Sequence, residues 1–166
     1  MAEETQIIEV GVADAKISVA PHILITYALG SCVGIILYDA ARRIGGLAHP
    51  MLPDITKSVM NSNQAKFVNS VLEMMINSLK AYGCNESSLC AKLFGGATLF
   101  TTGISANSDF FNIGERNISM AKQLLNEWRI KLVAEDTGGT YGRTVSCDLQ
   151  TGRVRVKSIY HGEKEF

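Results

Sequence analysis

The sequence predicts an α+β fold in which mixed β-sheets and two long helices form a layered sandwich. Two observations support this prediction. Short apolar segments rich in β-branched residues occupy the first third of the chain, and two amphipathic helical patterns lie among later apolar segments. A doubly wound nucleotide-binding fold is disfavoured, because strands and helices do not alternate regularly and no GxGxxG segment opens a helix.

Each element can be placed from the spacing of its apolar residues. Strands are expected at residues 6–12, 17–19, 23–28, 33–38, 44–51, 90–94, 131–135, 145–149 and 153–159. Helices are expected from about residue 62 to 82 and from about residue 113 to 128, where one stripe of each segment is apolar. The chain, residues 1–166, is expected to form a single domain with residues 1–5 and 162–166 as loose tails.

The charge balance disfavours several classes of partner. Sixteen basic residues offset sixteen acidic ones, so the composition offers no electrostatic footprint for nucleic acid. Residues 17–38 contain no Lys, Arg, Asp or Glu, but Pro21, Gly30 and Gly34 interrupt this segment, which therefore predicts two buried strands and a tight turn. We expect no membrane insertion, no secretion signal and a cytoplasmic location.

The four cysteines form neither a zinc-binding nor a disulfide pattern. Cys32, Cys84, Cys90 and Cys147 are scattered, without a CxxC pair or a histidine at zinc-finger spacing. We therefore expect free thiols, no metal site and no cofactor. The last three cysteines are interpreted as core or incidental residues, because no histidine lies near them in the sequence.

Cys32 and His49 are placed to act together if the segments that carry them form a hairpin. A two- or four-residue loop within residues 40–43 would place Gly34 opposite His49, and Cys32 opposite Met51. Cys32 and His49 would then be diagonal neighbours on one face, with Cβ atoms about 7 Å apart. A three-residue loop would place them on opposite faces, because side chains alternate along a strand.

Such a pair predicts a nucleophilic thiol. A nearby histidine accepts the thiol proton and lowers the thiol pKa, so that thiolate forms near neutral pH. Gly30 permits a tight bend, and the amides of Ser31 and Cys32 would converge on an oxygen beside the thiol. Ser31 is a competing nucleophile that lacks a GxSxG context. Without a partner, Cys32 would be a small buried core residue.

Several motifs in order resemble the CheD family of bacterial chemotaxis proteins. They are TYALGSC, HPMLP, FGGATLF, NIGERN, AEDTGG and YGR, and they extend from about Ile23 to Arg143. The resemblance implies a protein-glutamine glutaminase, a hydrolase of linear amides that converts chemoreceptor glutamines to glutamate and ammonia through a thioester on Cys32. It places the catalytic residues at Thr26, Cys32 and His49, and it implies the layered fold of deamidating-toxin cysteine hydrolases.

The resemblance also implies two protein partners. Methyl-accepting chemotaxis receptors, with a helical cytoplasmic domain, would be the substrate, and a CheC-like phosphatase would bind the same surface. An alternative function is therefore a regulatory binding module that stimulates a CheC-type phosphatase, and hydrolysis of receptor methyl esters is a third possibility. Within NIGERN, Asn112, Arg116 and Asn117 are candidates for a rim or partner contact, with helix capping as the alternative.

Overall fold

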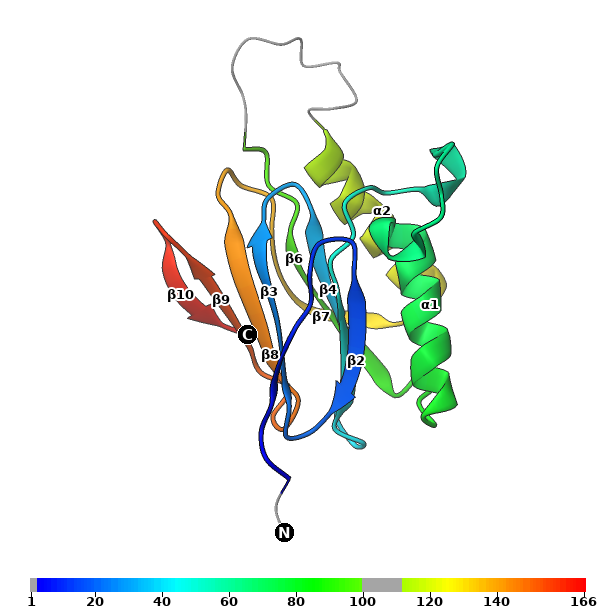
Figure 1. Cartoon of the computed structure of the whole chain (residues 1–166), viewed down its shortest axis with the longest axis vertical. Helices are drawn as coiled ribbons and strands as arrows, with labels where there is room; N and C mark the ends of the chain where they lie inside the picture. The colour runs from blue at the N-terminus through cyan, green and yellow to red at the C-terminus, as the bar shows by residue number, and fades with distance from the viewer. Residues whose placement is uncertain (1–2, 100–111) are drawn as a thin grey trace.

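The computed structural model describes residues 3–99 and 112–166, which form two five-stranded sheets stacked face to face (Figure 1). The first sheet contains, in spatial order, β1 (Ile7–Glu9), β3 (Ile23–Leu29), β8 (Arg143–Asp148), β9 (Val154–Ser158) and β10 (Gly162–Glu165). The second contains β2 (Ala15–Val19), β5 (Ile44–Ala48), β4 (Val33–Asp39), β6 (Leu89–Gly95) and β7 (Lys131–Thr137). The pairs β1–β3 and β6–β7 are parallel and the others antiparallel, so both sheets are mixed.

Two helices form the third layer. Helices α1 (Val68–Ala81) and α2 (Ile113–Glu127) pack against the outer face of the second sheet (Figure 1). Two 3-10 helices, η1 (Ile55–Lys57) and η2 (Gln64–Lys66), precede α1. The predicted α+β sandwich is therefore confirmed. No helix among the described residues is long and apolar enough to cross a membrane.

Strand β4 separates two hydrophobic cores. Val33, Ile35 and Leu37 point towards the helices. Ile36 and Tyr38 point instead into the space between the two sheets. Because all seven residues of β4 are buried, this strand is a continuous apolar segment rather than an alternating one. Any polar side chain that enters the core between the sheets must therefore find a partner there.

The tail predicted at residues 162–166 is wrong, because these residues complete the first sheet. Gly162–Glu165 forms β10, and Phe166 exchanges two backbone hydrogen bonds with Val154. The Phe166 ring packs edge-on against Phe94, with ring centroids 5.5 Å apart. All four residues of β10 are exposed, so this strand lacks the alternation that identifies a half-buried strand in a sequence. Residues 3–5 are exposed and belong to no helix or strand.

Helix α1 and strand β5 are shorter than predicted. The helix begins at Val68 rather than near residue 62, because η2 and its Asn63 cap occupy the preceding residues. Strand β5 ends at Ala48, just before His49 and Pro50. A proline at the end of a strand is expected, since it cannot donate a hydrogen bond to the ladder.

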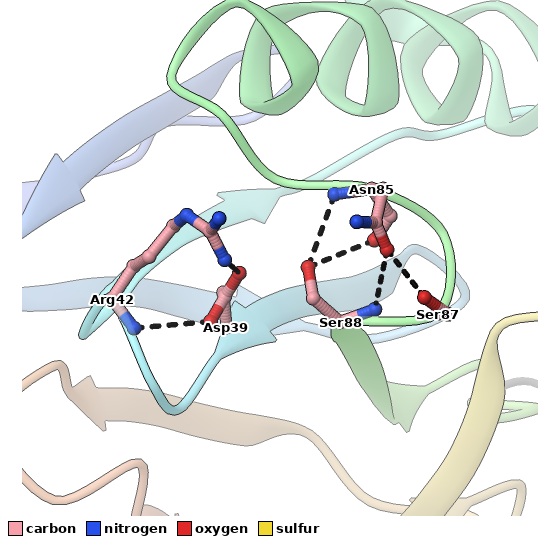
Figure 2. Close-up of polar contacts among 5 residues, drawn as sticks. All are labelled: Asp39, Arg42, Asn85, Ser87 and Ser88. Atoms are coloured by element: carbon pink, nitrogen blue, oxygen red, sulfur yellow. Dashed lines mark hydrogen bonds and ion pairs between the residues drawn. The ribbon is translucent and has the colours of Figure 1, made fainter.

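The loop between β4 and β5 sets the register of the central hairpin. Asp39 is fully buried, and its carboxylate accepts hydrogen bonds from the backbone N–H and the guanidinium of Arg42, both at 3.0 Å (Figure 2). A nearby turn is closed in a similar way by Asn85, Ser87 and Ser88 (Figure 2). The β4–β5 loop thereby contains the four residues 40–43, and Asp39 pairs with Ile44. The length of this loop therefore determines which side chains of β4 and β5 lie on the same face of the sheet.

Candidate active site

Thr26 faces the core in the regular alternation of β3, just before a β-bulge. The pairing with β8 shifts by one residue between Thr26 and Leu29. Both of these residues are buried, whereas Tyr27 and Ala28 between them are exposed. Ala28 has a φ of 56°, in the left-handed region, and this conformation is typical of bulges beside functional sites. The Thr26 side chain lies on the same face of β3 as Leu24, so its hydroxyl lies between the two sheets.

The hairpin register brings His49 to the same space. Ile35 pairs with Ala48, and the N–H of Val33 donates to the carbonyl of Pro50 at 3.4 Å, so Gly34 lies opposite His49. The His49 side chain is completely buried. The loop has four residues, which is one of the two lengths that the sequence analysis required for Cys32 and His49 to share a face. Cys32 packs against the core between the sheets, the space in which His49 meets Thr26.

A hydrogen bond joins Thr26 and His49 across the two sheets. The Thr26 Oγ1 atom lies 2.7 Å from His49 Nδ1, and it also lies 2.7 Å from the carbonyl oxygen of Val10. A hydroxyl has one hydrogen, which it donates to the carbonyl, so it accepts the Nδ1–H of the imidazole. The other nitrogen, Nε2, then carries a lone pair. It is buried and has no hydrogen-bond partner in the described part of the chain.

The imidazole and the thiol are both neutral at pH 7. Burial lowers the pKa of His49 to about 4. Burial also raises the pKa of the half-buried Cys32 thiol, and the backbone N–H of Cys32 partly offsets this effect by lowering the pKa. The expectation that His49 lowers the thiol pKa is therefore wrong for this structure, because a neutral imidazole supplies no positive charge. A neutral imidazole is nevertheless able to accept a proton at Nε2.

The turn that carries Cys32 is held by the loop after β6. The carbonyl of Gly30 accepts a hydrogen bond from the N–H of Ala97, and the carbonyl of Cys32 accepts one from Gly96, both at 2.8 Å. By contrast, the N–H groups of Ser31 and Cys32 donate to no other residue among those described. These two N–H groups are thus available beside the thiol.

Two glycines allow this loop and helix α2 to lie against the turn. Gly95 has a φ of 92°, and a Cβ there would lie 2.5 Å from the carbonyl oxygen of Cys32. A Cβ on Gly114, in the first turn of α2, would lie 2.5 Å from the carbonyl oxygen of Gly96. The absence of a Cβ at Gly95 and Gly114 therefore permits the close approach of these backbone segments.

The three NIGERN candidates differ in their positions. Asn112 is exposed and occupies the N-cap position of α2, but its side chain makes no capping hydrogen bond. Arg116 is half-buried. Asn117 is completely buried and donates hydrogen bonds to the carbonyls of Ser31 and Met51, so the expected rim contact is wrong for this residue. Gly114 and Asn117 are three residues apart and therefore lie on one helix face. This spacing indicates that Asn117 faces the same side as Gly114.

Residues of the AEDTGG and YGR motifs form a polar cluster next to the turn that carries Cys32. Arg143 is buried, its Nη2 lies 3.2 Å from Asp136 Oδ1, and its guanidinium stacks on the ring of Tyr141 at 4.2 Å. Arg143 pairs with Leu29, which directly precedes the Gly30 turn. This cluster therefore supports the end of β3 beside Cys32.

A groove of about 630 Å³ opens beside the turn. Its lining includes Ala28, Leu99, Tyr141, Ile159 and Tyr160. The Leu99 side chain, which lines the groove, reaches within 2.7 Å of the place that a Gly30 Cβ would occupy, so Leu99 lies between the groove and the turn that carries Cys32. Ile159 and Tyr160 are about nine-tenths exposed (91% and 89%), so this wall presents large apolar side chains to solvent.

The other three thiols all have raised pKa values, and the Cys84 thiol also hydrogen-bonds to the Asp39 carboxylate. Burial raises the pKa of Cys84 to about 11 and that of Cys147 to about 12, and it also raises the pKa of Cys90. No group of three or more His, Cys, Asp and Glu residues within 3–99 and 112–166 is arranged to hold a metal ion.

Comparisons with known proteins identify the family. The family model for CheD chemotactic sensory transduction matches residues 51–158. A relative from Caldanaerobacter subterraneus, named probable chemoreceptor glutamine deamidase CheD, is 48% identical over 97% of this chain and 98% of its own length. The chemoreceptor glutamine deamidase CheD of Halalkalibacterium halodurans is 39% identical over 96% of this chain and 98% of its own length. The chain belongs to the CheD family.

The fold of this CheD-family chain also occurs outside the family. A DUF152 protein from Neisseria meningitidis superimposes with a TM-score of 0.51 at 12% identity, covering 80% of this chain and 64% of that chain. This likeness concerns the fold alone. The CheD model begins after Thr26, Cys32 and His49, whereas the two relatives align over nearly the whole chain.

The contact of Gly95 with the Cys32 carbonyl predicts a sharp stability difference between two glycines. Gly95→Ala should lower the free energy of unfolding by about 1–3 kcal/mol or more, because the new Cβ meets a backbone oxygen in a left-handed conformation. Gly138→Ala is the matched control, since its φ is also positive (75°) but nothing lies within 4 Å of its Cβ position. Denaturant unfolding measures both, and equal losses would contradict this account.

The buried neutral His49 predicts a pH-dependent stability. Its pKa of about 4 in the folded state lies below the ordinary value of 6.5, so the unfolded chain binds more protons between these values. Stability contributed by this residue should be complete above pH 6.5, decline as the pH falls and be lost below pH 4, by about 3 kcal/mol at most. His49→Gln should flatten the curve of unfolding free energy over this range. Parallel curves for the two proteins would refute the assignment.

Proposed function

We propose that this protein is a chemoreceptor glutamine deamidase in which Cys32 is the nucleophile and His49 the general base. The names of its CheD relatives supply the substrate class. The observation that carries the proposal is the Thr26–His49 hydrogen bond, because it fixes the imidazole tautomer whose Nε2 accepts a proton on the face where Cys32 lies. Chemistry of this type hydrolyses a glutamine carboxamide to glutamate and ammonia.

The first half of the reaction forms a thioester. His49 Nε2 accepts the Cys32 thiol proton as the sulfur attacks the carboxamide carbon, and the carbonyl π electrons move to the oxygen. The N–H groups of Ser31 and Cys32 stabilise the resulting oxyanion. When the tetrahedral intermediate collapses, His49 returns the proton to the departing nitrogen, the C–N bond breaks and ammonia leaves.

The second half hydrolyses the thioester. His49 removes a proton from a water molecule as its oxygen attacks the thioester carbon, and the oxyanion forms again. Collapse breaks the C–S bond, and the sulfur recovers its proton from His49. The products are glutamate and the original thiol. Proton transfer within this neutral pair accounts for reactivity without a preformed thiolate, which agrees with the raised pKa of Cys32.

Receptor methyl esters would form the same thioester, so the residue types alone do not distinguish the two leaving groups. The deamidase function is favoured by the names of the relatives. Mass spectrometry of receptor cytoplasmic fragments separates the alternatives, because deamidation adds about one dalton to a glutamine and releases ammonia, whereas ester hydrolysis releases methanol.

The groove beside Gly30 is the proposed docking surface for the receptor segment that carries the target glutamine. A glutamine side chain is short, so the segment must lie against the surface next to Cys32. The groove begins at Leu99, which contacts Gly30, and it presents the exposed apolar side chains of Ile159 and Tyr160. An amphipathic helix is recognised by apolar surfaces of this kind. The proposed CheC-like phosphatase would bind the same surface.

Substitution of the three proposed catalytic residues should have graded effects on receptor deamidation. Cys32→Ala should abolish it, and His49→Ala should reduce it by about 10²–10⁴-fold, because the base is lost. Thr26→Val should reduce it by about 10²-fold, since it removes the acceptor that orients the imidazole, together with the hydrogen bond to the Val10 carbonyl, and leaves the nucleophile and the base in place. Thr137→Val is the control, because its hydroxyl donates to Glu135 on the surface and to no other residue within 3–99 and 112–166. Deamidation by folded Cys32→Ala would refute the mechanism.

A shared surface predicts competition between the receptor and a CheC-like phosphatase. The phosphatase should raise the apparent KM for a receptor fragment without lowering kcat, and Cys32→Ala should still bind it, because a methyl group replaces only the thiol. Steady-state deamidation and calorimetric titration measure the two effects. Full deamidation at saturating phosphatase would contradict the shared surface while leaving the deamidase chemistry intact.

A further inference from the structure

Asn117 connects the segment that carries the proposed nucleophile to the segment that carries the proposed base. Its side chain is completely buried in α2, and its Nδ2 donates to the carbonyl of Ser31 at 2.9 Å and to the carbonyl of Met51 at 3.0 Å. Ser31 directly precedes Cys32, and Met51 follows His49 by two residues. Both hydrogens of one amide are therefore used on the two halves of the site.

The first of these bonds determines where the Cys32 N–H points. The carbonyl of Ser31 and the N–H of Cys32 belong to one planar trans peptide group, in which they point in opposite directions. When Asn117 holds the carbonyl towards α2, the N–H is directed away from the helix. This is the N–H that lowers the pKa of the Cys32 thiol and is available for an oxyanion.

The second bond holds the backbone after His49. The N–H of Met51 donates to the carbonyl of Lys66 at 2.8 Å, and its carbonyl accepts the hydrogen bond from Asn117. Met51, which lies shortly after the end of β5, is thus held by hydrogen bonds at both its N–H and its carbonyl. Because one rigid amide contacts both segments, it restricts their separation as well as their orientation.

Helix packing determines how far the Asn117 amide reaches. Gly114 lies one turn earlier on the same face, where a Cβ would come within 2.5 Å of the Gly96 carbonyl oxygen. The helix backbone therefore lies directly on the loop that binds the Cys32 carbonyl. A side chain as short as asparagine can then reach the carbonyls of both segments.

We infer that Asn117 is a positioning residue for amide hydrolysis, which aims the Cys32 N–H at the developing oxyanion and holds the Cys32 and His49 segments together. This inference rests on the proposed cysteine chemistry. The Asn117 Oδ1 atom is buried and has no partner within the described chain, an arrangement that costs stability. An apolar side chain of the same size would avoid this cost but would leave both carbonyls without a donor.

The test compares Asn117→Leu with Asn69→Leu. Leucine has the same branched shape as asparagine but no hydrogen-bonding group. Asn69, in the first turn of α1, is the control, because its half-buried amide also joins a helix to a loop, through Asp54 and Ile55, without bonding to Ser31 or Met51. Asn117→Leu should lower kcat for receptor deamidation by about 10–100-fold with little change in KM. The pH midpoint of Cys32 alkylation by iodoacetamide should rise by about one unit, because the thiolate loses an aimed N–H.

The control should lose stability in thermal unfolding while its kcat and alkylation profile stay at the wild-type values. If Asn117→Leu fails to fold, Asn117→Ala provides the same comparison, because it removes the amide without adding bulk. Wild-type kcat and alkylation in a folded Asn117 variant would overturn the inference. Failure of the proposed cysteine chemistry is a different result, in which folded Cys32→Ala still deamidates the receptor.

Discussion

The hydrogen bond between Thr26 and His49 is the interaction on which the rest of the site depends. It crosses the mainly apolar core between the two sheets, and it is formed by two completely buried polar residues. Leaving either residue without its partner would cost about 1–3 kcal/mol, so the two sheets have one favourable alignment at this point. The same bond selects the imidazole tautomer, and thus a structural constraint and a chemical requirement coincide.

Burial has a second consequence for the chemistry. It keeps the imidazole and the thiol neutral, since it lowers the pKa of His49 and raises that of Cys32. A neutral imidazole and a neutral thiol leave the site without a charge before the substrate binds. In the proposed mechanism, charge develops only during attack, and the N–H groups of the Cys32 turn stabilise it. The site is therefore organised around the transition state rather than around a preformed ion pair.

Two glycines and the side-chain amide of one asparagine allow helix α2, which belongs to the third layer, to contact this site. Gly95 and Gly114 remove the Cβ atoms that would separate β6, the Cys32 turn and helix α2. Asn117 then spans the remaining distance with two hydrogen bonds. Motifs that are about 80 residues apart in the sequence thereby become parts of one structure, in which backbone contacts position the nucleophile more than side-chain contacts do.

Local patterns in the sequence were sufficient to predict the layered α+β fold, most strands and both helices, whereas the structure decided the loop length that sets the register of the Cys32–His49 hairpin. Alternation and helical spacing act over a few residues, so a single chain reveals them. The family resemblance added Thr26, which as a strand threonine has no signal of its own. The tertiary structure decided the neutral states of Cys32 and His49, because burial is a property of the assembled layers. It also decided that β10 completes a sheet and that Asn117 lies inside the protein, since an exposed charged strand and a buried helical amide depend on partners far away in the chain.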